Sequence, residues 1–151
     1  MSTIFDPAVR ASLEARLRAL GPASARQWGR MTPHEAICHL ADAFRVALRE
    51  KSAAPTPGRF KPLVRFVALR LPMRWPRDLK TLPEAEQGVG GTPPAEFERD
   101  RGDLLSLVDR FCAAAPGDLA PTHPIFDRMR RGDWGRWAYR HLDHHLRQFG
   151  V

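Results

Sequence analysis

Two histidines in the last segment of the chain constrain the fold more than any other feature. If residues 134–150 form an α-helix, at about 100° per residue, His141 and His145 lie within about 20° of Trp134, near Leu142. Charged residues such as Asp143 lie on the opposite side. A buried imidazole has two ring nitrogens to satisfy, so a pair of them in an apolar stripe needs hydrogen-bond partners or a metal ion. Their i, i+4 spacing suits one metal ion.

Length and cysteine content indicate one domain in a reducing compartment. The chain has 151 residues, of which 43% are hydrophobic, so we expect a single domain over residues 1–151 with its own core. Cys38 and Cys112 lie far apart in helix-like contexts, which favours the cytoplasm over a secreted disulfide framework. The N-terminus has no apolar leader, and the most apolar stretch, residues 62–71, is interrupted by two arginines. We expect a cytoplasmic protein with no membrane partner.

The basic charge raises the alternative of a nucleic-acid partner. The net charge is +7, and Lys and Arg side chains that neutralise phosphates supply most nonspecific affinity. Only three of the 24 basic residues are lysines, an arginine excess that is typical of codon bias. The arginines are spread along the chain, and no aromatic residues alternate with a basic run as they do in single-strand binders. The sequence therefore predicts no nucleic-acid partner.

Capping signals and apolar spacing predict two helices in the first third of the chain. Residues 6–7, Asp-Pro, are an N-cap followed by proline at the first helical position, and leucines recur at helical spacing up to residue 20. Residues 32–35, Thr-Pro-His-Glu, combine a capping box with a first-turn proline. An apolar stripe then continues to Glu50 and predicts the second helix.

A long irregular crossover follows the second helix. Residues 52–93 are rich in proline and glycine, and within them residues 60–71 can form a short basic amphipathic helix. Such a helix could bind a membrane surface or cover the bundle. We favour a lid in which Phe66, Leu69 and Trp75 pack on the bundle.

Two further helices complete the predicted fold. Thr92-Pro93 opens a third helix that continues to residue 115, and Asp133 caps a fourth helix that ends at Gly150. No segment shows strand-like alternation bounded by turns. The sequence predicts an all-α four-helix bundle with a long crossover between helices two and three.

A metal ion on the C-terminal pair needs a third protein ligand, for which the second helix offers His34 and His39. On its helical wheel His39 lies on the flank of the apolar arc, between Ala43 and Val46, whereas His34 lies beside Arg45. We therefore predict His39 as the third ligand.

Three segments carry a family resemblance that covers nearly the whole chain. WGRMTPHEAICHLADAF, HPIF and DWGRWAYRHLDHHLRQFG together resemble the DinB-like superfamily of four-helix-bundle metalloenzymes. In that superfamily one histidine of the second helix and an HxxxH pair of the last helix bind a divalent metal, which implies His39, His141 and His145 here. Members of the branch carry glycine after HPIF, where this chain has Asp127.

The resemblance also implies an activity. The superfamily includes thiol-dependent transferases and a maleylpyruvate isomerase, so we expect a metal-dependent transferase that acts with a low-molecular-weight thiol on a small-molecule substrate. Three imidazoles leave an open coordination position, as in catalytic zinc sites, and suit zinc, nickel or iron. The alternative is a noncatalytic metal-binding or ligand-sensing bundle, which could be a homodimer. No catalytic residue beyond the ligands is assigned.

The sequence also predicts the positions of other residues near the metal site. Gln148 lies on the same stripe as His141 and is expected to orient a ligand by a hydrogen bond. We expect His144 to be a partly exposed hydrogen-bonding neighbour and His34 a surface residue at the start of its helix. His123 could border the mouth of a cavity, but we favour a surface or loop-packing role. The four tryptophans are expected in the core or the lid.

Overall fold

The computed structural model describes residues 2–77 and 80–151. Its helices are α1 (Pro7–Ala19), α2 (Pro33–Ala47), α3 (Lys61–Arg70), the short 3-10 helix η1 (Pro83–Ala85), α4 (Phe97–Ala113) and α5 (Arg131–Gln148), and its strands are β1 (Thr122–His123) and β2 (Asp127–Arg128). Residues 78–79 of the crossover lie outside the described part of the chain.

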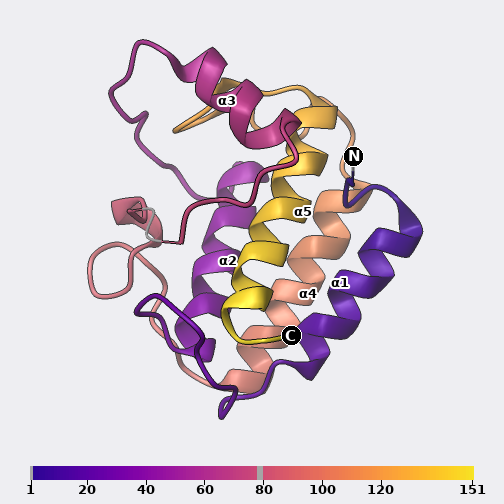
Figure 1. Ribbon diagram of the computed structural model, residues 1–151, viewed down its shortest axis with the longest axis vertical. Coiled ribbons are helices and arrows are strands. Elements are labelled where there is room, and N and C mark those ends of the chain that lie inside the picture. The colour runs from indigo at the N-terminus through magenta and orange to yellow at the C-terminus, as the bar shows by residue number, and fades with distance from the viewer. Residues whose placement is uncertain (1, 78–79) are drawn as a thin grey trace.

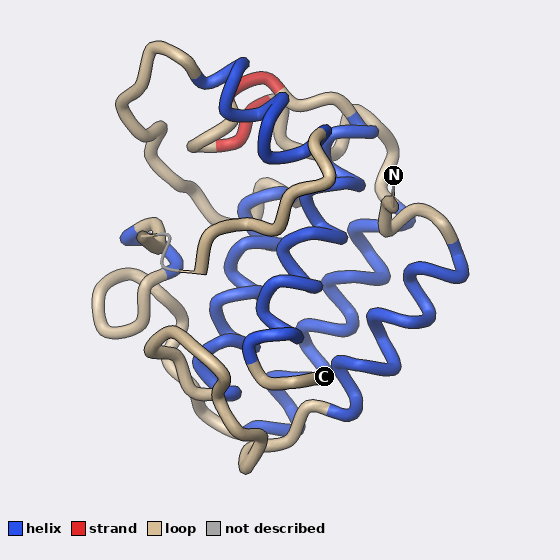
Figure 2. Tube along the Cα trace, viewed as in Figure 1, coloured by secondary structure: helices blue, strands red, loops and turns tan. Residues whose placement is uncertain are grey.

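Four helices lie alongside one another and form the bundle. α2 packs on α4 and α5, and α1 packs on α5 and α4, whereas α3 crosses one end of the bundle (Figure 1). The two short strands lie beside α3, at the same end (Figure 2). This arrangement confirms the predicted all-α bundle with a long crossover between its second and third helices. Within the described residues, no helix is both long enough and apolar enough to span a membrane.

The first two helices begin where their capping signals predict. The Asp6 carboxylate accepts hydrogen bonds from the backbone N–H groups of Ala8 and Val9, which would otherwise lack partners at the start of α1. At α2, Thr32 and Glu35 cap one another's backbone in a complete capping box. α2 ends slightly earlier than predicted, at Ala47, because the chain turns through a left-handed residue, Arg49, at φ 63°.

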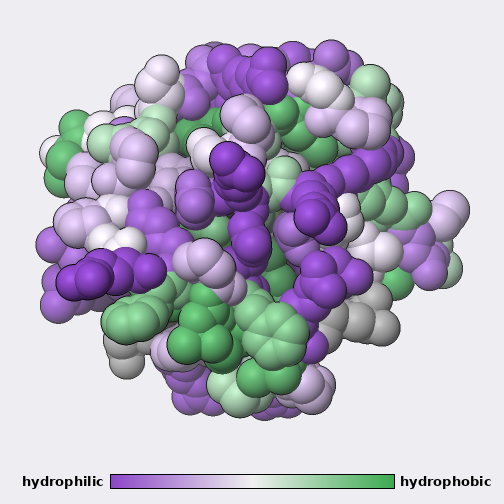
Figure 3. Space-filling view, turned by 90° about the horizontal axis from the view of Figure 1, so that it is seen from above, coloured by the Kyte–Doolittle hydropathy of each residue, from purple (hydrophilic) through white to green (hydrophobic). Residues whose placement is uncertain are grey.

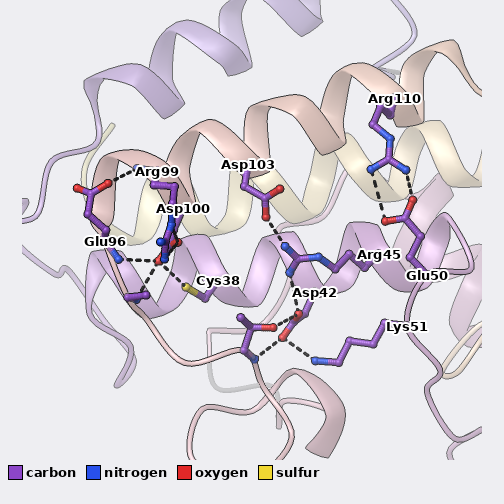
Figure 4. A network of polar contacts seen from close by, with 12 residues as sticks. Cys38, Asp42, Arg45, Glu50, Lys51, Glu96, Arg99, Asp100, Asp103 and Arg110 are labelled. Atoms are coloured by element: carbon purple, nitrogen blue, oxygen red, sulfur yellow. Dashed lines mark hydrogen bonds and ion pairs between the residues drawn. The ribbon is translucent and has the colours of Figure 1, made fainter.

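The prediction that Thr92-Pro93 opens the third bundle helix is wrong. α4 begins at Phe97, with Glu96 as its N-cap. Thr92 is held instead by Asp42 of α2, whose carboxylate accepts from the Thr92 N–H and hydroxyl, each at 2.7 Å. Asp42 also pairs with Lys51 at 2.8 Å (Figure 4). This buried carboxylate fixes the end of the crossover as an extended segment, so the helix starts later.

The segment before the last helix also differs from the prediction. α5 is capped by Arg130, and Asp133 lies inside its first turn, where its carboxylate accepts from the Arg130 N–H at 3.2 Å. The expectation of no strands is wrong at four residues, because β1 and β2 pair as a small antiparallel hairpin. Two-residue strands are too short to show an alternating pattern. Asp127, the residue after HPIF, has φ 58°, a left-handed conformation that Asp adopts more easily than most residues.

The core of the bundle is aromatic at its centre. Phe44 packs edge-on against Phe111 at 5.1 Å, and Trp134 packs at right angles to Trp137 at 5.0 Å. All four side chains are buried, as predicted for the two tryptophans of α5. The N-terminal segment crosses α5 at Gly135, where a Cβ would lie 2.3 Å from the Thr3 hydroxyl. These contacts hold α5 against α2 and α4 and so fix its histidines relative to α2.

The lid is confirmed only in part. Leu69 is fully buried and Trp75 is half-buried against the bundle, but Phe66 is 53% exposed and does not pack as predicted. Phe60 and Leu63 are also exposed. Figure 3 looks onto this end of the molecule and shows hydrophobic residues gathered in a patch among hydrophilic ones. α3 therefore rests on the bundle by one side and leaves apolar surface uncovered on others.

Candidate metal centre

The three predicted ligands come together between α2 and α5. His39 projects from α2, while His141 and His145 project from successive turns of α5, and one ring nitrogen from each lies within 4.8 Å of the others. The Nε2 atoms of His39 and His141 are 3.0 Å apart. These three histidines form a cluster that could hold a metal ion.

A backbone carbonyl fixes the ring of His39. Its Nδ1 lies 3.1 Å from the carbonyl oxygen of Ala85 in η1. A carbonyl only accepts, so Nδ1 carries the ring hydrogen and donates it, and Nε2 presents a lone pair to the cluster. The crossover thus sets the tautomer that a metal ligand requires, a contribution that the periodicity of α2 could not reveal.

A relay of hydrogen bonds fixes His145 in the same way. Gln148 Nε2 donates to the carbonyl oxygen of Trp28 at 3.0 Å, which leaves Gln148 Oε1 to accept from His145 Nδ1 at 2.9 Å. The remaining nitrogen of His145, Nε2, then carries the lone pair. This contact confirms the hydrogen bond predicted for Gln148 within the site. Gly29, at φ 76°, lies so close that a Cβ there would be 2.6 Å from Gln148 Nε2.

His141 is held by ring packing rather than by a hydrogen bond on its far side. Its ring lies 5.2 Å from that of Trp137 and 6.0 Å from that of Trp75, centroid to centroid. Its Nδ1 is buried and has no hydrogen-bond partner within the described residues. Core histidines usually satisfy both nitrogens, so this ring does not behave as an ordinary core residue.

Burial keeps all three rings neutral. It lowers the pKa of His39, and it lowers the pKa of His141 and His145 well below the ordinary value. The neighbouring imidazoles lower the pKa of His141 further. Neutral imidazoles are the form that binds a metal ion, so no proton has to be removed at neutral pH. The donor set and the tautomers of His39 and His145 fit a divalent cation.

The histidine cluster lies in the wall of a large cavity. The cavity has a volume of about 1030 Å³ and is lined by all three histidines. α3 contributes apolar side chains such as Leu63 and Val67 to the lining, and Trp75 also lines the cavity, beside His141. A metal ion bound to this cluster would therefore keep an open coordination position toward the cavity.

The remaining histidines lie outside the cluster. His144 is half-buried at the edge of the site, as predicted, but its ring packs edge-on to Trp28 at 6.0 Å rather than on a hydrogen-bond partner among the described residues. His123 is 7% exposed and stacks on Phe126 at 4.7 Å, as a loop-packing residue would, and it also lines the cavity. His34 is not a free surface residue, because its Nε2 lies 2.8 Å from a carboxylate oxygen of Asp100. Trp75 packs against the core and also lines the cavity, and Trp28 lies beside His144.

The family model of the DinB superfamily matches residues 8–149. The chain belongs to the DinB superfamily. The match includes all four bundle helices and the three clustered histidines, which agrees with the resemblance drawn from the sequence segments. No curated protein and no solved structure matches the chain. For this DinB-superfamily protein, the chemistry therefore has to be argued from the histidine cluster and the cavity.

Proposed function

We propose that this protein binds one divalent cation through His39, His141 and His145 and acts as a metal-dependent transferase that uses a small thiol. The observation that carries the proposal is the position of three neutral imidazoles in the wall of a cavity of about 1030 Å³. Three protein ligands with access to a cavity are typical of catalytic rather than structural metal sites. Zinc, nickel and iron all suit imidazole ligands.

The residues of the chain orient and protect such a site. A bound divalent cation would lower the pKa of a coordinated thiol and so favour the thiolate nucleophile near neutral pH. The Ala85 carbonyl and Gln148 hold two ligand rings in the required tautomer. The apolar wall from α3 and the ring of Trp75 limit the access of water to the reacting groups.

A noncatalytic role is the second candidate, and a specific observation favours it. The cluster joins α2 to α5, and His39 is also bonded to η1, so a cation there would stabilise three separate elements. A metal-binding or ligand-sensing bundle of this kind would unfold when the cation is removed. Chelation distinguishes the two functions, because an enzyme of the proposed kind would stay folded and regain turnover on addition of metal.

Metal content tests the assignment of ligands. Elemental analysis of untagged protein is expected to give one divalent metal per chain and to give none for His141→Ala/His145→Ala. His144→Ala is the matched control, since His144 lies on the same helix outside the cluster, and it should keep the metal. Equal metal content in the double variant and the parent would contradict the proposal.

A thiol-transfer assay tests the proposed catalytic activity. The protein is incubated with glutathione, cysteine or coenzyme A and with monochlorobimane, an electrophile whose chloride is displaced as the carbon–sulfur bond forms. We expect adduct formation above the uncatalysed rate only in metal-loaded protein with the three histidines intact. A folded, metal-loaded protein that accelerates none of these reactions would favour the noncatalytic role.

A further inference from the structure

A second group of metal-binding side chains lies on the part of α2 that faces α4. His34 and Cys38 are one helical turn apart on α2, and Asp100 belongs to the first turns of α4. One ligand atom from each lies within 4.8 Å of the others. None of these three residues takes part in the histidine cluster or in the cavity of the proposed function.

The three side chains converge on one carboxylate oxygen. Oδ2 of Asp100 lies 2.8 Å from His34 Nε2 and 3.9 Å from Cys38 Sγ. Figure 4 shows the thiol of Cys38 directed at this carboxylate across the gap between the two helices. A thiol, an imidazole and a carboxylate are three donor types that zinc-class cations accept together.

More hydrogen-bond donors surround Oδ2 of Asp100 than it has lone pairs to accept them. It also accepts from the backbone N–H groups of Ala95 and Glu96, at 2.9 and 3.2 Å. One carboxylate oxygen offers about two lone pairs, which these two backbone groups can occupy, whereas the other oxygen, Oδ1, offers two more, one of which a cation could use. The His34 imidazole and the Cys38 thiol must then compete with these backbone groups for hydrogen bonds to Oδ2. A cation would use the imidazole lone pair and the sulfur directly as ligands, so neither would need a hydrogen bond to Asp100.

The cluster is accessible to a cation without a change of fold. The side chains of His34 and Asp100 are 23% and 18% exposed, and Cys38 lies beneath them at 3%. We propose that His34, Cys38 and Asp100 form a second divalent-cation site, of the zinc class, that fastens the first turns of α2 to the start of α4. On binding, the Cys38 sulfur gives up its proton to solvent and bonds to the cation, while solvent fills the remaining position.

Cobalt(II) distinguishes this site from the histidine cluster. It binds in zinc-type sites, and a thiolate ligand gives it a near-ultraviolet charge-transfer absorption that imidazole ligands do not give. Only Cys38 and Cys112 could supply a thiolate. Cys112 lies on α4 with its Sγ 3.9 Å from the Ile4 carbonyl, outside both clusters, so Cys112→Ser is the matched control.

Titration of the full chain with cobalt(II) is expected to produce this absorption in the parent protein and equally in Cys112→Ser. Cys38→Ser should lose it, and His34→Ala should weaken cobalt binding by about tenfold or more. The band should persist in His141→Ala/His145→Ala, so failure of the proposed function would not remove it.

The proposal is overturned if no thiolate band appears in the folded parent protein or if the band disappears in Cys112→Ser. If Cys38→Ser does not fold, as judged by circular dichroism, the titration of Cys112→Ser still tests the proposal. Cys38 is the only thiol of that variant, so a thiolate band in it can come only from Cys38. If folded His34→Ala bound cobalt(II) as tightly as the parent protein, that result would also contradict the ligand set.

Discussion

Oε1 of Gln148 lies 2.9 Å from Nδ1 of His145, and this contact determines which nitrogen of His145 faces the candidate metal site. The amide of Gln148 cannot be reversed without loss of its bond to the Trp28 carbonyl, which accepts from Nε2 at 3.0 Å. The loop that precedes α2 therefore orients a side chain of α5. Groups that orient metal ligands in this way usually affect metal affinity almost as strongly as the ligands do.

Removal of the Gln148 amide should weaken metal binding. We expect Gln148→Ala to lower the affinity for zinc by about 10- to 100-fold, because the ring of His145 loses the acceptor that fixes its tautomer. Competition with a chromophoric chelator measures the affinity. Arg147→Ala is the control, since Arg147 pairs with Asp143 away from the cluster. Equal affinities in the two variants would show that Gln148 does not orient the ligand.

Gly29 should be required for the same contact. In Gly29→Ala the new Cβ would lie 2.6 Å from Gln148 Nε2, and the residue would also keep a strained φ of 76°. Gly88→Ala provides a control for strain alone, because its φ is 79° but nothing lies within 4 Å of the added Cβ. Both variants should lose about 1 kcal/mol in stability from the left-handed conformation. Only Gly29→Ala should also lose zinc affinity, and a loss in both variants would contradict this account.

The free energy of unfolding should decrease as the pH is lowered, because His123 is buried in its neutral form. Burial first, and Lys61 second, lower the pKa of His123 to about 3, from 6.5 for an ordinary histidine. Because the folded pKa lies below the unfolded one, the unfolded chain binds more protons between these values, and stability declines as the pH falls below 6.5. From pH 7 to pH 5 this one residue should remove about 2 kcal/mol.

The variant His123→Phe tests this dependence. Phenylalanine keeps the stacking on Phe126 but has no group to protonate, so the variant should lose about 2 kcal/mol less than the parent between pH 7 and pH 5. Urea unfolding with EDTA present measures both proteins without a contribution from metal. Parallel losses in the two proteins would exclude His123 as the cause.

Asp42 should be the most important carboxylate for stability. Its side chain is fully buried, and burial alone would raise its pKa, but hydrogen bonds from Lys51 and Thr92 more than offset this and keep the pKa below the usual value. Asp42→Asn removes the buried charge that these donors surround and should cost about 3 kcal/mol of unfolding free energy.

The control for Asp42 is Asp103, which pairs with the same Arg45 from a position that is 49% exposed. Asp103→Asn should cost less than about 1 kcal/mol, because exposed ion pairs contribute little. Urea denaturation at pH 7 compares the two variants. A similar cost for both would mean that the attachment of Thr92 to α2 contributes no more than a surface contact.

Short-range patterns in the chain account for the bundle helices and for the side of α5 on which the histidine pair lies. Caps such as Thr32 with Glu35, and apolar spacing within one helix, are local signals, so they predict the four bundle helices and place His141 and His145 on one stripe. The choice of His39 over His34 also followed from the wheel, because the two residues point to different neighbours, α5 and α4.

The way in which these histidines are held depends on contacts that form only when distant segments pack together. The Ala85 and Trp28 carbonyls reach His39 and Gln148 from loops whose course no periodic pattern encodes, and the late start of α4 depends on a carboxylate 50 residues earlier in the chain. Spacing within a helix fixes directions around one axis, whereas hydrogen bonds between distant segments depend on how the crossover packs. For that reason the three histidines that cluster could be predicted, but their tautomers and the cavity beside them could not.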